Sequence, residues 1–282
     1  MHTLAQLGLG LVFSSLIAWI AYRREALSLS GAAGAIITGT VIFGFGGWAW
    51  GLTLITFFVL STLLSKYKAR AKARLSEKFA KGSRRDLGQA FANGGAGALL
   101  AVAYPFVTHP AVLFAFVGAM ATVNADTWAT ELGVLARRPP RLITTGRAVE
   151  PGTSGGISAL GTLATLAGGL AIGLAALLYL LLDGALGGGG LRAAGGTTLA
   201  LVAAGALGGA AGSLIDSLLG ATVQAIYYTR GRNKETEKPI DPDGTPNELV
   251  RGWRWLNNDW VNFLSSCAGA AAGAGVYFAL VR

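Results

Sequence analysis

The chain has 282 residues, of which 52% are hydrophobic and 13% are charged, against about 25% charged in an average soluble domain. This composition excludes an ordinary water-soluble domain and predicts an all-α, polytopic transmembrane helical bundle that forms a single integral membrane domain, residues 1–282. The net charge of +9 does not predict nucleic-acid binding, because the basic residues fall in short blocks between apolar stretches, where they set topology and attract anionic membrane lipids.

Eight apolar stretches are long enough to cross a bilayer as helices, which takes roughly 17 to 25 residues. In chain order they are residues 4–22, 28–46, 48–65, 89–107, 110–132, 156–182, 197–224 and 258–280. The second stretch meets the third in the neighbourhood of Gly46 and Gly47, so these two stretches can instead form a broken or re-entrant hairpin. The expected number of spans is therefore about eight, with a range of six to eight.

The loops between these stretches predict the orientation, because cytoplasmic loops carry an excess of Lys and Arg. With eight spans and the N-terminus outside, the inside segments hold 21 of the 23 basic residues; they are residues 23–27, 66–88, 133–155 and 225–257. We expect the loop 66–88 to form a basic helix on the lipid headgroups, and the loop 225–257, with three prolines, to be an irregular flap. In a bacterium the membrane would be the plasma membrane.

Acidic residues within two of the spans are candidates for a functional site, because an ionised Asp at the centre of a membrane helix costs at least ~2.5–3.5 kcal/mol. Asp126 and Glu131 lie near the cytoplasmic end of the fifth span, and Asp216 lies in the seventh. With no His or Cys nearby, three carboxylates predict a Mg²⁺ site rather than a zinc site. The alternative is that these acids pair with Arg or Lys and only hold helices together.

Helical spacing predicts which polar side chains accompany these acids. Residues three or four apart share a face, which groups Ser213, Asp216 and Ser217 in one span, and Asn124, Thr127 and Glu131 in the other. Asp126 falls on a different face from Glu131, so a ligand that contacts both must be large, or the helix must distort. Asn93 opens the fourth span, and Asn258 and Asn262 open the last, so these polar groups are expected at one depth.

A glycine-rich turn opens the sixth span and consists of Gly152, Thr153, Ser154, Gly155 and Gly156. Such turns expose backbone N–H groups and the positive end of a helix dipole, which bind phosphate. A Ser or Thr before a helix is more often only an N-cap. Beside acids that can hold Mg²⁺, the turn nevertheless indicates a nucleoside triphosphate, with Thr144, Thr145 and Arg147 just upstream.

These blocks resemble an integral membrane family that includes the plant phytyl-phosphate kinase of tocopherol synthesis. The resemblance covers nearly the whole chain and is carried by Asn93-Gly94-Gly95 and by residues 125–133, 152–156 and 212–221. A more distant similarity links Asp126-Thr127-Trp128-Ala129 and the segment from Thr144 to Ser154 to CTP-dependent dolichol kinases and CDP-diacylglycerol synthases. The lysine pair and glutamate of those enzymes are replaced here by Thr144-Thr145 and Gly146-Arg147.

The resemblance implies transfer of a phosphoryl group from a nucleoside triphosphate, with CTP favoured, to an isoprenoid monophosphate such as phytyl, farnesyl or geranylgeranyl phosphate, giving the diphosphate. On this hypothesis Asp126 and Asp216 are catalytic and bind Mg²⁺ together with Glu131. The nucleotide-binding residues would be Thr144, Thr145, Arg147, Gly152, Thr153, Ser154, Gly155 and Gly156. The acceptor would be bound by Asn93, Asn124, Ser213, Ser217, Asn258 and Asn262.

Other functions remain open at this point. A cytidylyltransferase or a polyprenol kinase would use the same residues, but a hydroxyl acceptor needs a base, which Asp126 or Asp216 would have to provide. A lipid or ion transporter would place its polar groups near the middle of the membrane and would show inverted repeats; a pure scaffold would need no such site. The expected partners are the prenyl lipid, the nucleotide and membrane lipids, with no nucleic acid, and a homodimer is allowed.

Overall fold

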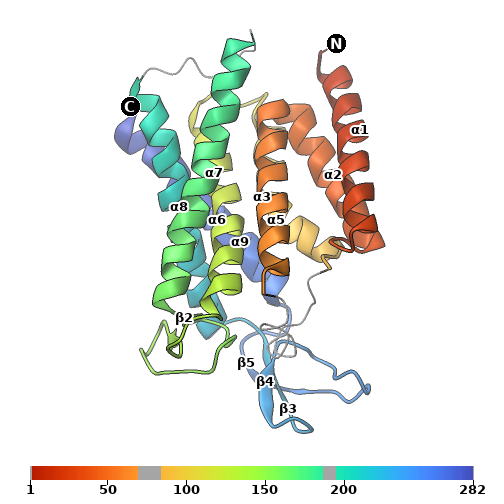
Figure 1. The fold of residues 1–282 in the computed structure, drawn as a ribbon, viewed down its shortest axis with the longest axis vertical. Coiled ribbons are helices and arrows are strands. Elements are labelled where there is room, and N and C mark those ends of the chain that lie inside the picture. Colours follow the sequence, from red (N-terminus) through yellow and green to blue (C-terminus); the bar gives the residue numbers. More distant parts are fainter. Residues whose placement is uncertain (1, 69–83, 187–194, 282) are drawn as a thin grey trace.

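The computed structural model of the chain describes residues 2–68, 84–186 and 195–281. These residues form a bundle of eight helices with two small antiparallel sheets at one end, which we call the sheet end (Figure 1). The N- and C-termini both lie at the opposite end of the bundle (Figure 1). Seven of the described helices have the length and apolar composition of membrane spans, and one is shorter. The prediction of a polytopic helical membrane protein is confirmed.

Each helix corresponds to one predicted span. The helices are α1 (His2–Arg23), α2 (Leu29–Gly46), α3 (Trp48–Lys66), α5 (Leu87–Ala103), α6 (Ala111–Gly133), α7 (Ala159–Ala185), α8 (Gly195–Thr222) and α9 (Asn258–Leu280). The fourth span ends at Ala103 rather than at residue 107, because Pro105 has no N–H to continue the helical hydrogen bonds. Gly47, with φ of +86°, ends α2 and separates it from α3.

The two sheets correct one expectation about the loops. Strands β1 (Arg141–Leu142) and β2 (Gly156–Ile157) form a pair, and a second sheet has the order β4-β3-β5. Its strands are β3 (Ile226–Thr229), β4 (Lys234–Thr236) and β5 (Glu248–Arg251). The prediction of an irregular flap over 225–257 is therefore wrong, because β-branched and aromatic residues pair there and all three prolines fall between β4 and β5. We call residues 226–251 the β-lobe.

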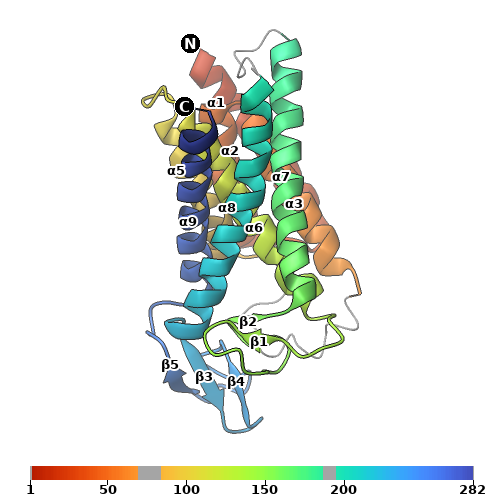
Figure 2. The same cartoon turned by 90° about the vertical axis from the view of Figure 1, so that its left-hand side faces the viewer.

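The described parts of the connections predicted to share one side of the membrane lie at the sheet end (Figures 1 and 2). Between α1 and α2, Leu27 pairs with Arg85 just before α5, and Lys66 at the end of α3 donates a hydrogen bond to the carbonyl oxygen of Arg24. The turns after α6 and α8 carry the two sheets. The predicted basic helix within 66–88 falls mostly on residues 69–83, which lie outside the described residues.

Helix α6 is the centre of the bundle, and residues 113–125 of it are all buried. It crosses α8 and α9 at glycines, where a Cβ on Gly118 would overlap the carbonyl oxygen of Gly269, and one on Gly208 would lie 2.7 Å from the Cα of Gly118. Small residues of this kind let membrane helices approach to backbone contact. Asp126 follows Gly118 by eight residues and Asp216 follows Gly208 by eight, about 12 Å in each helix, so the crossing places both carboxylates at one depth.

This crossing generates a prediction about stability. A Cβ at Gly273 of α9 would overlap the carbonyl oxygen of Phe114, whereas a Cβ at Gly275 of the same helix has nothing within 4 Å. We expect Gly273→Ala to destabilise the bundle by about 1–3 kcal/mol, the usual cost of overpacking. Thermal unfolding of the detergent-solubilised protein should show a lower Tm for Gly273→Ala and an unchanged or higher one for Gly275→Ala. Equal melting temperatures for the two variants would contradict the close crossing.

Candidate functional site

A cavity of about 720 Å³ opens at the sheet end, between α5, α6, α7, α8 and α9. Most of the predicted site residues line it, although they come from separate parts of the chain. These are Asn93, Asp126, Glu131, Gly152, Thr153, Ser154, Gly155, Gly156, Ser213, Asp216, Ser217, Asn258 and Asn262. The helix ends therefore bring together the polar groups that the sequence placed at one depth.

Four predicted residues lie elsewhere, and the contacts expected of them are not made in this structure. Asn124 is fully buried; its amide donates to the carbonyl oxygen of Gly168 in α7 at 2.8 Å, and its Oδ1 accepts from Ser61 at 3.5 Å. It holds helices together rather than facing the cavity. Thr144, Thr145 and Arg147 are exposed in the turn after β1 and do not line the cavity, because a backbone bond from Leu142 to Arg147 closes that turn on itself.

Asp126 of α6 and Asp216 of α8 both line the cavity. Asp126 forms a side-chain hydrogen bond with Ser213, and the Ser265 hydroxyl of α9 lies 3.1 Å from Oδ2 of Asp216. Both carboxylates are half-buried and interact electrostatically with each other and with Glu237. Like charges that approach away from bulk water repel strongly, so a cation in this part of the cavity would be stabilised.

Glu237 is a functional candidate that the sequence did not single out. It directly follows β4, and its Oε1 accepts hydrogen bonds from Ser154 Oγ at 3.0 Å and from Gln224 Nε2 at 2.9 Å. The β-lobe thus adds a third carboxylate to those of the two helices and ties it to the glycine-rich turn. In the sequence, Glu237 is one charge among many in a mixed loop, and only a correct prediction of the β4-β3-β5 sheet would have brought it near the cavity.

The glycine-rich turn, residues 152–156, is held against the end of α8. Gly152 and Gly155 have φ of +80° and +81°, and a Cβ on Gly155 would lie 2.6 Å from the Cα of Ala221. Glycine is required at residue 155 both by this backbone conformation and by the close approach. The sequence predicted that this turn leads directly into the sixth span, but it does not enter α7 directly. Gly156 and Ile157 pair with β1 first, and Ser158 then caps the helix by accepting a hydrogen bond from the Gly161 N–H. Ser158 also lines the cavity.

Arg85 is a second residue that the sequence analysis counted only as a topological charge. It lines the cavity from just before α5 and donates a hydrogen bond from its guanidinium to Thr62 of α3 at 3.0 Å. Burial lowers the pKa of Arg85, and the negative charge of Glu131 partly offsets this effect. An arginine keeps its charge in such surroundings, so the cavity wall includes a cationic group as well as carboxylates.

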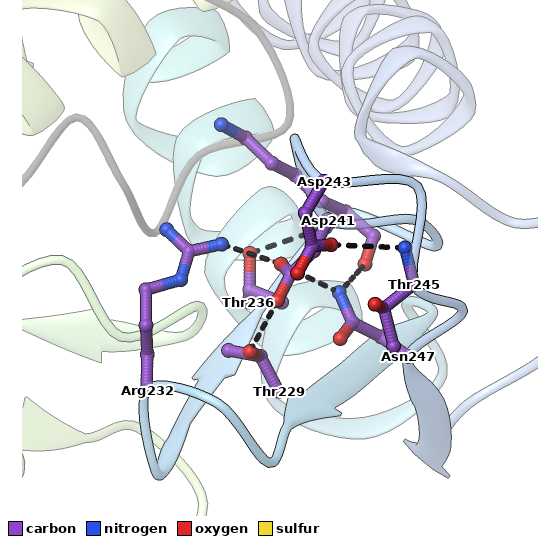
Figure 3. A network of polar contacts seen from close by, with 8 residues as sticks. Thr229, Arg232, Thr236, Asp241, Asp243, Thr245 and Asn247 are labelled. Carbon is purple, nitrogen blue, oxygen red and sulfur yellow. Dashed lines mark hydrogen bonds and ion pairs between the residues drawn. The ribbon is translucent and has the colours of Figure 1, made fainter.

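A network of hydrogen bonds and an ion pair holds together the part of the β-lobe that follows Glu237 (Figure 3). Asp241 accepts hydrogen bonds from Thr229 Oγ1 at 2.6 Å and from Asn247 Nδ2 at 3.1 Å, and it pairs with Arg232. These donors, Thr229 first and then Asn247, lower the pKa of Asp241 to about 2. The network joins β3 to the segment between β4 and β5, and so sets the path of the chain that leaves Glu237.

The arrangement of acids bears on the predicted metal. Among the residues that the structure describes, no three His, Cys, Asp or Glu side chains are grouped closely enough to hold a metal ion by themselves. Asp126 and Asp216 provide hard oxygen ligands, and Ser213, Ser217 and Asn262 add neutral oxygens to the same wall. Such a set suits an ion that takes its remaining ligands from water or from a substrate.

Comparison with known proteins shows extended similarity to membrane proteins. Residues 12–270 match the family described as integral membrane protein DUF92. Protein PGR of Arabidopsis thaliana is 35% identical over 274 residues, which cover 90% of this chain and 90% of that protein. An uncharacterized membrane protein of Methanocaldococcus jannaschii is 30% identical over 281 residues, with 99% and 98% covered, and one of Synechocystis sp. is 28% identical over 258 residues, with 90% and 83% covered. No solved structure matches the chain.

The Asp241 network predicts how the β-lobe depends on pH. Because the folded-state pKa lies below the ordinary value, the ionised carboxylate stabilises the lobe fully at neutral pH, and this contribution is lost as the pH falls from about 4 towards 2. At neutral pH we expect Asp241→Asn to speed limited proteolysis between β3 and β5 roughly fivefold or more, since a charged acceptor is lost.

Asp243→Asn is the matched control, because Asp243 is exposed and accepts a bond from the Thr245 N–H two residues away. Its cleavage rate should stay close to that of the wild type. If Asp241→Asn were cleaved no faster than this control, the network would not be what holds the lobe.

Proposed function

The chain belongs to the DUF92 family of integral membrane proteins, and on that premise we propose that it is a Mg²⁺-dependent kinase of membrane lipids. It transfers a phosphoryl group from a nucleoside triphosphate, with CTP favoured, to an isoprenoid monophosphate such as phytyl, farnesyl or geranylgeranyl phosphate. The observation that carries the proposal is the cavity of about 720 Å³, in which carboxylates, an arginine and a glycine-rich turn meet at one end of a membrane bundle.

The position of the cavity suits two substrates of opposite solubility. A prenyl phosphate keeps its hydrocarbon chain in the bilayer, whereas a nucleotide arrives from water. A polar cavity at the end of apolar helices can receive both, and a site at the centre of the membrane cannot be reached by the nucleotide. The polar groups lie at the sheet end and not at the midplane, where coupling sites of transporters lie, and this favours an enzyme over a transporter.

The acids fit Mg²⁺. This ion is usually held by one or two carboxylates, with water and substrate phosphates completing its shell. We propose Asp126 and Asp216 as the ligands, with Glu131 and Glu237 in the surrounding wall. When bound, the ion would neutralise the charge of the transferring phosphoryl group.

The residues of the chain then have positioning roles. We propose that the N–H groups of Ser154 and Gly155 face the nucleotide phosphates, since the N–H groups of Thr153 and Gly156 are used within the turn. Arg85 and Asn93 would orient the acceptor phosphate. One oxygen of this phosphate attacks the γ-phosphorus, the bond from the γ-phosphorus to the β–γ bridging oxygen breaks, and its electron pair leaves with the nucleoside diphosphate.

No general base is needed in this reaction. A monophosphate with a second pKa near 6 has an ionised oxygen at neutral pH, and phosphoryl transfer depends mainly on positioning and charge neutralisation. A free prenol would instead require Asp126 or Asp216 to remove a proton. We further propose that the sheet end faces the cytoplasm, where nucleotides are, because it carries the basic connections; in a bacterium this places the enzyme in the plasma membrane.

The test is a phosphorylation assay on the purified full chain in detergent. With Mg²⁺ and labelled CTP, UTP, ATP or GTP, phytyl, farnesyl or geranylgeranyl monophosphate should be converted to the diphosphate. Conversion of the free prenols instead would make the chain a polyprenol kinase, and release of pyrophosphate with a cytidylyl product would make it a cytidylyltransferase. If no combination yields a product, the proposed function fails.

Substitutions of the two helix acids sharpen this test. We expect Asp126→Asn and Asp216→Asn each to lower kcat/KM by about 100-fold or more, the size of loss that follows removal of a preorganised electrostatic group. Asp183→Asn is the control, because Asp183 lies near the end of α7 far from the sheet end. Its turnover should match the wild type. Full activity in Asp126→Asn would remove that residue from the site.

A further inference from the structure

A second cavity, of about 80 Å³, lies between α1, α2, α3 and α5. Its wall is almost entirely apolar, with Phe13 and Ile17 from α1, Phe43 from α2, and Leu54, Ile55 and Phe58 from α3. Phe13, on the α1 side of this wall, is 47% exposed, so this side of the cavity borders the surroundings of the bundle, which in a membrane are lipid. We call it the apolar groove.

The apolar groove and the polar cavity share part of their walls. Arg85, Gln89 and Asn93 line both, and Gln89 and Asn93 lie one helical turn apart on α5. The polarity changes across these three side chains, with carboxylates and asparagines on one side and aromatic and aliphatic groups on the other. A molecule that bridges the two spaces must therefore have an ionic or polar head and a hydrocarbon tail.

Arg85 marks the boundary most clearly. Its guanidinium lies 5.5 Å from the centre of the Phe58 ring, which faces the apolar groove, and interacts electrostatically with Glu131, which faces the polar cavity. Its backbone is fixed by bonds to Ala26 and Ser28, between α1 and α2. A cation held in this way is a suitable partner for the phosphate of a lipid whose tail continues past Phe58.

We propose that the apolar groove binds the hydrocarbon tail of a lipid monophosphate whose phosphate lies against Arg85, Gln89 and Asn93. The identification of this lipid as the acceptor of a phosphoryl group rests on the proposed function. The binding mode itself rests on the shared wall and on the change of polarity across it.

The dimensions of the groove limit how much of the tail it encloses. From Phe58 to Gly51, seven residues of α3, the groove extends about 10 Å. The groove ends where α2 meets α3. There the Phe43 ring packs directly on Gly51, so closely that a Cβ on Gly51 would lie 2.6 Å from Cδ2 of Phe43. The part of the tail next to the phosphate is therefore held by α2, α3 and α5, and the remainder of a long chain leaves past Phe13 into the bilayer.

The experiment compares two tryptophan variants of α3 in a binding assay without nucleotide. Ile55 lines the groove, whereas Val59, one turn away, is 44% exposed and does not line it. The probes are geranylgeranyl monophosphate and inorganic phosphate, titrated onto the purified full chain in detergent. We expect Ile55→Trp to weaken binding of geranylgeranyl monophosphate about tenfold, because excluding two CH₂ groups from an apolar site already has this effect.

The control variant Val59→Trp should bind geranylgeranyl monophosphate as the wild type does, and inorganic phosphate should bind both variants equally. Equal loss in both variants, or none in either, would overturn the proposed groove. Competition by a neutral C20 alcohol as strong as that of the phosphate would also overturn it, because it would indicate binding of any hydrocarbon chain without a contribution from the phosphate. The binding assay contains no nucleotide, so its result is independent of the phosphorylation assay. Binding that depends on Ile55, without any product in the phosphorylation assay, would refute the kinase alone. Product in that assay, without a difference in binding between Ile55→Trp and Val59→Trp, would refute the groove alone.

Discussion

The close crossing of α6 with α8 and α9 is the constraint on which the rest of the molecule depends. Backbone contact at Gly118, Gly208 and Gly269 fixes how far the three helices can slide or rotate against one another. Asp126 follows Gly118 on α6 by the same number of residues as Asp216 follows Gly208 on α8. On α9, Ser265 precedes Gly269 by one turn. The carboxylates meet because the backbones are locked one or two turns away, so a membrane helix bundle of small residues provides the rigidity that a soluble enzyme obtains from a packed core.

This arrangement collects negative charge where water is scarce. Asp126, Asp216 and Glu237 interact electrostatically, and each has a hydrogen-bond partner that supports its charged form, from Ser213, Ser265 and Gln224 respectively. Hydrogen bonds do not cancel the mutual repulsion of three acids. A cation does, and a phosphate brought in with that cation then needs Arg85 or backbone N–H groups for its remaining charge. On the proposed function, a bound cation and a phosphate would together offset these charges.

The sequence predicted the parts of the site that follow from helix geometry. Hydropathy located the spans, and the parity of basic loops placed Asp216, Asn258 and Asn262 at one end. Helical spacing did not decide the direction of every residue, since Asn124 shares a face with Glu131 yet is buried against Gly168. Glu237 could not be predicted, because it reaches the cavity through strand pairing between residues far apart in a loop whose prolines indicated irregular structure. Arg85 was hidden among nine basic residues of 66–88, and only its burial distinguishes it.

The β-lobe and the bundle have different roles in this architecture. The bundle sets distances between Asp126, Asp216 and Asn262 through helix contacts that are buried and rigid, whereas Glu237 is held by side-chain bonds to Ser154 and Gln224. Such bonds to exchangeable polar partners open more readily than packed helices do. The cavity is therefore firm on its membrane side and adjustable on its aqueous side. On the proposed function, the lipid would meet the wall that the packed helices form, and the nucleotide would meet the side of the cavity that the β-lobe completes.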